Sequence, residues 1–490
     1  MIENNVWIVP DSIKTNVKII NSILVYRKKE DVDIEDKELL YKSRLVILGN
    51  LQDNTQFDIT KISSPVMNST TTRALVAKAA INKWQIYHLD VVTAYLNSPL
   101  PESDVIYMAL PKEIVERGYP RVVQLRKALY GLRQSGYLWN QLMTEFLIST
   151  GFKQCISDPC LFVNVEKEIY LGLYVDDSFI TGPDSPVEEI INQISKRFKT
   201  TNKGLMKKFL GINVDQSQKG IILINQKDYI LKILEKCKMT ECYPTLTPAI
   251  PHSVLAAPEK SDNTETYPYS SIVGKLLWIS IMTRPDIAYQ VGQLTRFISK
   301  YGQDQISACK YLLRYLKGTI NKSIKYDTKC GEQLIAYTDA TWANDSDMRS
   351  VSGNVFLLGG GAISWLAKSQ SSVALSSCAS EYFSCSEAAK EAIYKRILLS
   401  DLRFKGYTGI NTPPTNILCD NQPAILVANG TNKHAHVKHI LLRLQYLREL
   451  IKEKQISLTY VPSSENVADA LTKNLAKPQF IILRALLLGN

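Results

Sequence analysis

Two adjacent carboxylates stand between two apolar runs in the segment LGLYVDDSFITG, residues 171–182. Like charges repel each other, and a half-buried carboxylate is costly unless a cation lies against it. Asp176 and Asp177 are therefore expected at the tip of a β-hairpin, because Asp tolerates turn geometry. The simplest interpretation is an ordinary turn, and the alternative is a metal site at a strand tip. The segment alone does not distinguish the two.

Composition limits the kinds of protein that this chain can be. Its 490 residues exceed a single core and suggest about two to four domains. The excess of 58 Lys+Arg over 47 Asp+Glu, a net charge of +11, favours a polyanionic partner such as nucleic acid.

Nine scattered cysteines without a C-x-x-C pair argue against a disulfide framework or a zinc ribbon, and for a reducing compartment. The chain does not begin with a signal peptide, and no run approaches the roughly 20 apolar residues of a membrane span, so we expect a soluble intracellular protein.

A proline-rich segment, residues 244–270, divides the chain and is predicted to be an exposed connector. Before it, short β-rich runs alternate with amphipathic helices, which predicts an α+β domain. One of these helices follows Gln134, and its apolar stripe of Leu138, Leu142 and Phe146, with Trp139 and Met143 beside them, is predicted to pack in a core.

The region after the connector begins with helices and then changes to strands. One predicted helix places Lys310, Arg314 and Lys317 on one face, which is either solvated or in contact with phosphates. Strands, a long helix from about Ser380, and then two further strand–helix pairs predict a second, separate α/β domain. The predicted strands are residues 334–343, 354–360, 373–378, 416–420 and 456–462.

A further candidate carboxylate, Asp90, ends the apolar run in IYHLDVVTAYLNSPL. Two-metal phosphoryl transfer needs carboxylates from separate strands that converge on divalent ions about 3.5–4 Å apart. Asp90 from one strand and Asp176 with Asp177 from a neighbouring hairpin would meet that need. Each fragment alone is more often structural than catalytic.

Six segments together resemble the reverse transcriptase of copia-type LTR retrotransposons, the pseudovirus group. They are YKSRLVILGN, WQIYHLDVVTAYLNSPLPESDVIYMALP, QLRKALYGLRQSGYLWN, GFKQCISDPCLF, LYVDDSFITG and LMKKFLGINV, in family order between residues 41 and 214. The resemblance continues through SSIVGKLLWISIMTRPDIAYQVGQLTRF and YLKGT. It implies an α+β right-hand polymerase with fingers, palm and thumb, followed by an α/β ribonuclease H-like domain with a mixed sheet. The expected parts are fingers and palm 1–243, connector 244–270, helical thumb or connection 271–332, ribonuclease H-like domain 333–478 and C-terminal tail 479–490.

The resemblance also implies roles for single residues of the polymerase. Asp90 is expected as the first metal ligand, with Asp176 and Asp177 as the Y-x-D-D pair. Tyr95 matches an aromatic gate against the ribose 2′-OH, which would favour dNTPs, and Arg44 matches a contact to the triphosphate. The other expected substrate-binding residues are Tyr130 and Gln134 around the nucleotide, and Phe209 and Gly211 in the FLGI segment that resembles a primer grip.

The C-terminal region resembles the ribonuclease H domain of the same elements through YTDATWA, SSCASEYFSCSEAAKEA, CDNQPAI and VPSSENVADALTK. The carboxylates at the matching positions are Asp339, Glu381, Asp420 and Asp469. They are expected on a strand, early in a helix, at the end of a strand and in the last helix, respectively. Four acids from four elements can form one Mg²⁺ site that hydrolyses a phosphodiester.

The function implied is an RNA-directed DNA polymerase with ribonuclease H activity, using two Mg²⁺ ions per site, or Mn²⁺ in their place. The implied partners are an RNA template, a DNA primer, RNA/DNA hybrid and dNTPs, with other Gag and Pol products of the element and no membrane. The implied cellular location is the cytoplasm, in a virus-like particle, or the nucleus. An inactive nucleic-acid-binding relic is the alternative, although no expected ligand carboxylate is lost. An RNA-templated RNA polymerase would share the paired aspartates, and Tyr95 argues against it.

Two features depart from this pattern. Leu441 stands where the family commonly has an Asp after KHI, which would weaken ribonuclease H if that acid matters for cleavage. His434, His436 and His439 could form a zinc site, but no thiolate or carboxylate stands at ligand spacing.

Overall fold

The structure is a computed structural model that describes residues 5–14, 17–30, 39–54, 57–258, 267–343, 348–409, 412–430 and 438–489. The chain forms two compact units. The first unit comprises Met1–Met67, His88–Ile180 and Ser185–Gly204, and the second comprises Asn68–Tyr87, Thr181–Asp184 and Leu205–Asn490.

One sheet of the first unit has five strands in the order β1-β6-β5-β2-β3. The long strands β2 and β3 pair antiparallel, with Val25 opposite Arg44. Their inner face carries Ile20, Leu45 and Ile47, which are buried against Met108 of β5. The strands are β1 Trp7–Ile8, β2 Ile19–Glu30, β3 Leu39–Ile47, β5 Tyr107–Ala109 and β6 Val122–Leu125, with the helix α2 Lys112–Val115.

The second sheet has six strands in the order β11-β4-β10-β9-β8-β7, and it lies mainly in the first unit. The predicted hairpin around residues 171–182 is confirmed, since β9 and β10 are neighbours in this sheet. The strands are β4 Gln85–Val91, β7 Lys153–Gln154, β8 Leu161–Asn164, β9 Ile169–Tyr174, β10 Asp177–Gly182 and β11 Thr200–Leu205. The helices are α3 Ser135–Ser149, α4 Asp184–Arg197 and the 3₁₀ segments η1 Gly49–Leu51, η3 Ile59–Lys61 and η4 Ala94–Asn97.

Helix α3 follows Gln134 as predicted, and Trp139 and Met143 of its apolar stripe are buried, as is Leu147. Leu138, Leu142 and Phe146, which the prediction placed at the centre of the stripe, are half-buried. The buried face is centred on the side of Trp139, whose indole N–H donates to the Val175 carbonyl oxygen at 2.6 Å.

The second unit begins with helices and a small sheet. The sheet has the order β12-β13-β14-β15, with strands β12 Lys208–Phe209, β13 Ile212–Asp215, β14 Ile221–Asn225 and β15 Ile324–Asp327. The helices are α1 Ser69–Asn82, α5 Lys227–Lys236, α6 Tyr269–Met282, η5 Pro285–Ile287, α7 Ala288–Thr295, α8 Gln303–Gly318 and η6 Thr328–Cys330.

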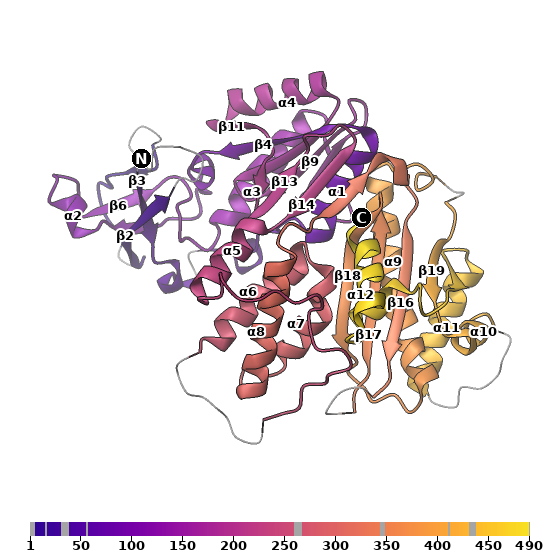
Figure 1. Ribbon diagram of the computed structural model, residues 1–490. Helices are drawn as coiled ribbons and strands as arrows, with labels where there is room; N and C mark the ends of the chain where they lie inside the picture. The colour runs from indigo at the N-terminus through magenta and orange to yellow at the C-terminus, as the bar shows by residue number, and fades with distance from the viewer. Residues whose placement is uncertain are drawn as a thin grey trace. The chain divides into compact units, whose positions relative to one another are not determined.

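The last sheet is mixed, as predicted, with the order β18-β17-β16-β19-β20. β16 pairs antiparallel with β17 and parallel with β19, and β20 extends the parallel part. Helix α9 packs on this sheet, and α10 and α11 lie at its β19–β20 end (Figure 1). The elements are β16 Ile335–Thr341, β17 Val351–Leu358, β18 Gly361–Ser369, α9 Ser377–Asp401, β19 Thr415–Cys419, α10 Gln422–Ala428, α11 Lys438–Lys452, β20 Ile456–Tyr460, η7 Val467–Leu471 and α12 Lys477–Leu488.

The strand predicted at residues 373–378 is wrong, and β18 takes its place in the sheet. Val373 and Leu375 are 53% and 78% exposed, so this apolar run has no sheet face to bury. Ser376 instead caps α9, accepting a hydrogen bond at 3.1 Å from the Ala379 backbone N–H.

One hydrophobic core joins the helices of the second unit to its last sheet. Buried residues of α5, α6, α7 and α8 form a single cluster with side chains such as Val355 of β17, Leu471 of η7 and Phe480 of α12. The helices and the mixed sheet are therefore one packed body. In the described part of the chain, no helix combines the length and apolarity needed to cross a membrane.

Candidate functional site

The first carboxylate cluster, Asp90, Asp176 and Asp177, lies where β4 meets the β9–β10 hairpin. Asp90 belongs to β4, Asp176 to the hairpin turn and Asp177 to the start of β10. The Val91 N–H donates to the Asp176 carbonyl oxygen at 2.8 Å, which joins the two strands at the level of the acids. Val175, with φ +56°, makes the turn. The strand pairing thus brings the three predicted ligands to one edge.

Two cationic or ionisable side chains contact this cluster. His88 Nε2 lies 2.7 Å from Asp177 Oδ1. Lys203 Nζ lies 3.4 Å from Asp177 Oδ1 and 3.9 Å from Asp90 Oδ1. Burial raises the pKa of Asp176, and the neighbouring charges of Asp177 and Asp90 add to the rise. Burial would also raise the pKa of Asp177, but its bond to His88 and the charge of Lys203 lower it.

Arg44, Tyr95 and Tyr130, the expected nucleotide contacts, lie together in the first unit. The rings of Tyr95 and Tyr130 meet edge to face with centroids 4.9 Å apart, and the Arg44 guanidinium lies 5.5 Å from the Tyr130 ring. Burial raises the pKa of both tyrosines, and the negative charge of Asp176 raises it further. The segments that follow Arg44 and Tyr130 approach each other closely, since a Cβ added at Gly131 would lie 2.0 Å from the Ile47 carbonyl oxygen.

The other expected substrate contacts have different surroundings. Gln134 is buried and its side chain is engaged within the protein, accepting from Gln52 Nε2 at 3.1 Å and donating to Asp104 Oδ2 at 3.3 Å. Phe209 and Gly211 belong to the second unit, at the tight turn between β12 and β13. Phe209 is 3% exposed, and Gly211 has φ +79°.

The second carboxylate cluster, Asp339, Glu381, Asp420 and Asp469, is built on the mixed sheet. Asp339 lies on the central strand β16, Asp420 directly follows β19, and Glu381 lies in the first part of α9, as predicted. Asp469 was expected in the last helix, and this is wrong: it lies in the short 3₁₀ segment η7. Asn466 starts that segment by accepting from the Ala468 N–H at 3.2 Å, and the chain leaves it before α12 begins.

Hydrogen bonds and ion pairs with Lys473 orient these carboxylates. The Thr472 hydroxyl donates to Asp339, and the Ser463 hydroxyl donates to Asp420 Oδ2 at 2.6 Å. Lys473 Nζ lies 3.0 Å from Asp469 Oδ2. Asp469 Oδ1, in contrast, is buried with no hydrogen-bond partner among the described residues.

Burial and mutual repulsion dominate the electrostatics of the second cluster. Burial, with the charges of Asp339 and Asp420 and the Cys419 thiol, raises the pKa of Glu381 to about 11. Burial and the charge of Asp339 raise the pKa of Asp469 to about 7, although Lys473 opposes the rise. Burial likewise raises the pKa of Asp339. Such carboxylates gain from any cation that enters the cluster.

The donor atoms of the second cluster fit a divalent metal. In the residues that the structure describes, two sets of ligand atoms lie within 4.8 Å of one another: Asp339, Asp420 and Asp469, and Glu381, Cys419 and Asp420. The first set consists of hard oxygen donors, as Mg²⁺ prefers, and Asp469, one of its three residues, has a buried oxygen without a hydrogen-bond partner among the described residues. Asp90, Asp176 and Asp177 form no such set among the described residues, and Asp177 Oδ1 is turned toward His88 and Lys203.

Sequence reasoning missed the side chains that contact the carboxylates. His88 stands two residues before Asp90 on the same strand, and Lys473 stands four residues after Asp469, so spacing alone could have singled out both. Lys203 has no spacing in the sequence that relates it to the carboxylates.

Leu441, which replaces the Asp common in the family, is 44% exposed in α11. His434 and His436 lie outside the described residues, as does the side chain of His439, so the suggested zinc site is not described.

Comparison with known proteins identifies the family. Residues 4–251 match the family described as "Reverse transcriptase (RNA-dependent DNA polymerase)". The chain belongs to this reverse transcriptase family. It is also 34% identical over 475 residues to "Retrovirus-related Pol polyprotein from transposon TNT 1-94" of Nicotiana tabacum, a plant copia-type transposon. That match covers 94% of this chain and 35% of the relative, so the chain spans about a third of the length of the curated relatives it matches.

Solved structures of low sequence identity share the fold. The foamy viral protease-reverse transcriptase in complex with ds DNA has a TM-score of 0.51 at 10% identity, over 94% of this chain and 67% of that chain. The same viral protein in complex with RNA/DNA hybrid has a TM-score of 0.50 at 12% identity, over 94% and 51% of the two chains. The expected fold class, a reverse transcriptase polymerase followed by a ribonuclease H-like mixed sheet, is confirmed.

Proposed function

We propose that this chain is an RNA-directed DNA polymerase with an attached ribonuclease H, acting by two-metal phosphoryl transfer on an RNA/DNA primer–template. The observation that carries the proposal is the gathering of the expected carboxylates into two separate clusters, one where β4 meets the β9–β10 hairpin and one built from β16, α9, η7 and the residue after β19. The functional parts are proposed at 1–243 for fingers and palm, 271–332 for thumb or connection, and 333–478 for the nuclease, with a connector and a tail between and after them.

In the polymerase, Asp90, Asp176 and Asp177 would hold Mg²⁺, or Mn²⁺ in its place. When bound, the ions would lower the pKa of the attacking primer 3′-OH and stabilise the charge on the leaving diphosphate. His88 fixes one oxygen of Asp177, which leaves the other carboxylate oxygens of the cluster for the ions. Tyr95, which packs edge to face against Tyr130, would exclude a ribose 2′-OH sterically.

Arg44 would bind the triphosphate of the incoming dNTP. Its guanidinium is half-buried beside the Tyr130 ring, which limits its freedom and points to a fixed contact. Phe209 and Gly211 would support the primer. Gln134 would act indirectly, since its amide already bonds to Gln52 and Asp104.

In the nuclease, Asp339, Glu381, Asp420 and Asp469 would hold the ions that assist hydrolysis of the RNA strand. Thr472 and Ser463 orient two of these carboxylates by hydrogen bonds. The substrate would be recognised by its backbone and 2′-OH groups rather than by its sequence. Support for these partners comes from the net charge of +11 and from the foamy viral structures, whose titles name ds DNA and RNA/DNA hybrid.

The test is dTTP incorporation on poly(rA)–oligo(dT) with Mg²⁺, together with cleavage of an RNA/DNA hybrid. Asp176→Asn should abolish synthesis and leave hybrid cleavage intact, and Asp420→Asn should do the opposite. Well-folded wild-type protein that performs neither reaction would contradict the proposal and favour an inactive relic. Loss of both activities in one of the variants, with the fold preserved, would contradict the assignment of two separate sites.

A further inference from the structure

Lys473 occupies an unusual position in the second carboxylate cluster. Its ammonium lies 3.0 Å from Asp469 Oδ2 and 3.8 Å from Asp339 Oδ2. The two carboxylates are nearly inaccessible, with side-chain exposures of 2% and 3%, whereas the Lys473 side chain is 36% exposed. One lysine thus bridges two buried acids and still reaches solvent.

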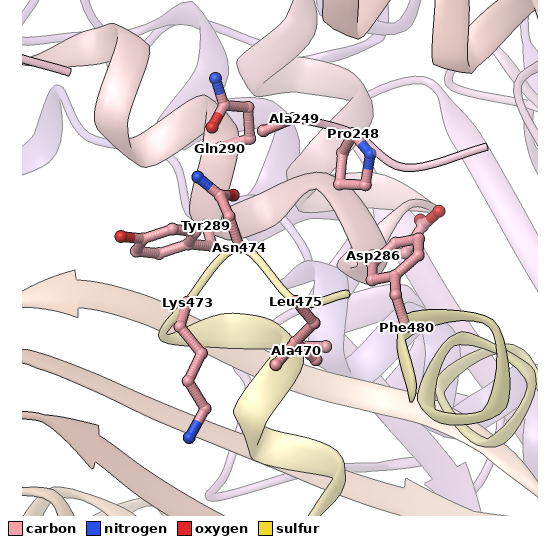
Figure 2. Close-up of a pocket in the computed structure, with 10 residues that line it drawn as sticks. All are labelled: Pro248, Ala249, Asp286, Tyr289, Gln290, Ala470, Lys473, Asn474, Leu475 and Phe480. Carbon is pink, nitrogen blue, oxygen red and sulfur yellow. The ribbon is translucent and has the colours of Figure 1, made fainter. Parts of the chain in front are cut away.

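The backbone of this lysine is fixed from the other side by residues before the thumb helices. Asn474 Nδ2 donates to the Ser253 carbonyl oxygen at 2.8 Å, and the His252 N–H donates to the Asn474 carbonyl oxygen at 2.9 Å. Between these segments is a cavity of about 10 Å³, enough for one water molecule. Figure 2 shows Lys473 at its edge, with the ammonium directed away from Pro248, Ala249 and Gln290. The main chain is held while the side chain extends toward the acids.

The ammonium and a divalent ion would compete for the same carboxylates. Asp339, Asp420 and Asp469 form the hard-oxygen set that fits a metal, and Lys473 contacts two of these three residues. A cation that binds this set must place its charge within a few ångströms of the ammonium, where repulsion between like charges is strong. The flexible four-carbon stem and its partial exposure give the ammonium a way out toward solvent.

We infer that Lys473 is a resident cation of the nuclease cluster: it neutralises Asp339 and Asp469 in the metal-free protein and leaves them when a divalent ion binds. Lys473 thereby sets the metal concentration at which the cluster fills. The inference rests on the proposed function in taking this cluster as the metal site of the nuclease, but its test does not depend on cleavage.

The test measures Mn²⁺ binding to the full chain by electron paramagnetic resonance, with Asp339→Asn defining the ions bound at this cluster. Lys473→Met, or Lys473→Gln if the first variant does not fold, should bind Mn²⁺ there about tenfold more tightly than wild type, because one like charge is gone. In EDTA the same variant should melt at a lower temperature than wild type, and saturating Mn²⁺ should raise its melting temperature by more. Lys473→Arg should keep the weaker binding, and Lys477→Met, at an exposed lysine four residues later, should match wild type.

A purely structural role for Lys473 predicts a different pattern. In that case Lys473→Met would bind Mn²⁺ more weakly or equally, and this result would overturn the inference. Tighter Mn²⁺ binding in a protein whose wild type cleaves no hybrid would instead uphold the inference and contradict the proposed nuclease function. Failure of the inference about Lys473 and failure of the proposed nuclease function are therefore distinguishable.

Discussion

The contact between His88 and Asp177 shows how one side chain can fix the orientation of a neighbouring carboxylate. The two acids of the hairpin differ because of it: the pKa of Asp177 is lowered, while that of Asp176 is raised by burial and by its acidic neighbours. Since His88 and Asp90 face the same side of β4, the strand presents a carboxylate of the cluster and a side chain that orients Asp177 together.

We expect His88→Ala to reduce DNA synthesis by about 10–100-fold, the usual effect of removing a group that orients a metal ligand. The comparison is dTTP incorporation by the variant and the wild type. Hybrid cleavage by the same preparations should stay unchanged, since the second carboxylate cluster is made of other residues. His88→Gln, which can still donate to Asp177, should recover part of the activity. Full activity in His88→Ala would show that Asp177 needs no such support.

Asp286 forms the most enclosed ion pair of the second unit's described helices. It accepts two hydrogen bonds from Arg284, at 2.8 and 2.7 Å, and one from the Tyr315 hydroxyl at 2.5 Å. Asp286→Ala would leave the Arg284 guanidinium buried without its counter-charge. We expect it to lower the free energy of unfolding by about 3–5 kcal/mol in urea titrations. The exposed Glu241→Gln should change it by less than about 0.5 kcal/mol, and an equal effect of both variants would refute the argument.

The same ion pair gives a pH dependence with a definite sign. Burial would raise the pKa of Asp286, but Arg284 and Tyr315 outweigh burial and lower it. A lowered folded-state pKa contributes stability above the unfolded value of about 3.9, and that stability is lost as the pH falls further. Between about pH 5 and about pH 3 the wild type should therefore lose more unfolding free energy than Asp286→Asn. Equal losses of unfolding free energy in the wild type and Asp286→Asn, measured by urea titration, would contradict this pH dependence.

The carboxylates themselves could be predicted from the sequence, whereas most of their neighbours could not. Asp90, Asp176, Asp177 and the acids of the second cluster stand in segments whose apolar flanks and order are visible in the chain. Lys203 reaches Asp177 only because β11 pairs beside β4, which is a tertiary fact. The side chain of Gln134 turned out to bond to Gln52 and Asp104, neither of which is near it in sequence.

Among the elements, η7 depends on one glycine of the neighbouring strand. Gly353 of β17 lies opposite Asp339 in the register, and a Cβ there would be 2.7 Å from Thr472 Cγ2 and 3.1 Å from the Ala468 carbonyl oxygen. The missing side chain lets the segment that carries Asp469 approach the sheet.

Gly353→Ala should therefore push η7 outward and reduce hybrid cleavage by at least about tenfold, since a misplacement near 1 Å is costly for catalysis. DNA synthesis by the same protein should be retained. Gly274→Ala in α6 is the matched control, because nothing lies within 4 Å of the Cβ that it adds. Hybrid cleavage at the wild-type rate by Gly353→Ala would show that η7 can shift without consequence.

Two sequence patterns could not be interpreted from the pattern alone, because other segments decide how their residues are used. The run at residues 373–378 looks like a strand, but β18 is closer to β17 through a tight turn and takes that edge. Likewise, the basic face of α8 is partly used within the protein. Arg314 donates to the Tyr243 carbonyl oxygen at 2.7 Å, and the Lys310 ammonium lies 5.3 Å from the Tyr267 ring.

At the scale of the whole second unit, Arg73 joins three segments that are far apart in sequence. From α1 it donates to the carbonyl oxygens of Ile363 in β18 at 2.7 Å and of Ile281 and Met282 in α6 at 2.9 and 3.0 Å. Its guanidinium lies 4.1 Å from the centroid of the Trp365 ring. These bonds and the common hydrophobic core make residues 333–490 depend on the helices that precede them.

We therefore expect a fragment of residues 333–490 to show no cooperative thermal transition by circular dichroism, because the side chains that α6, α7 and α8 cover would be exposed. Co-expression with a fragment of residues 1–332 should restore a folded complex. A monomeric 333–490 fragment that melts cooperatively would contradict this expectation and show that the mixed sheet folds independently.

The position of Arg73 has a consequence for how the C-terminal mixed sheet could be exchanged between lineages. Helix α1 precedes that sheet by more than two hundred residues, yet it bonds directly to β18. A recombination event that replaced only the C-terminal third would bring in a strand that has not evolved together with this helix. Inheritance of the mixed sheet is thereby tied to that of α1, and compensating changes should concentrate at Arg73, Trp365 and the end of α6.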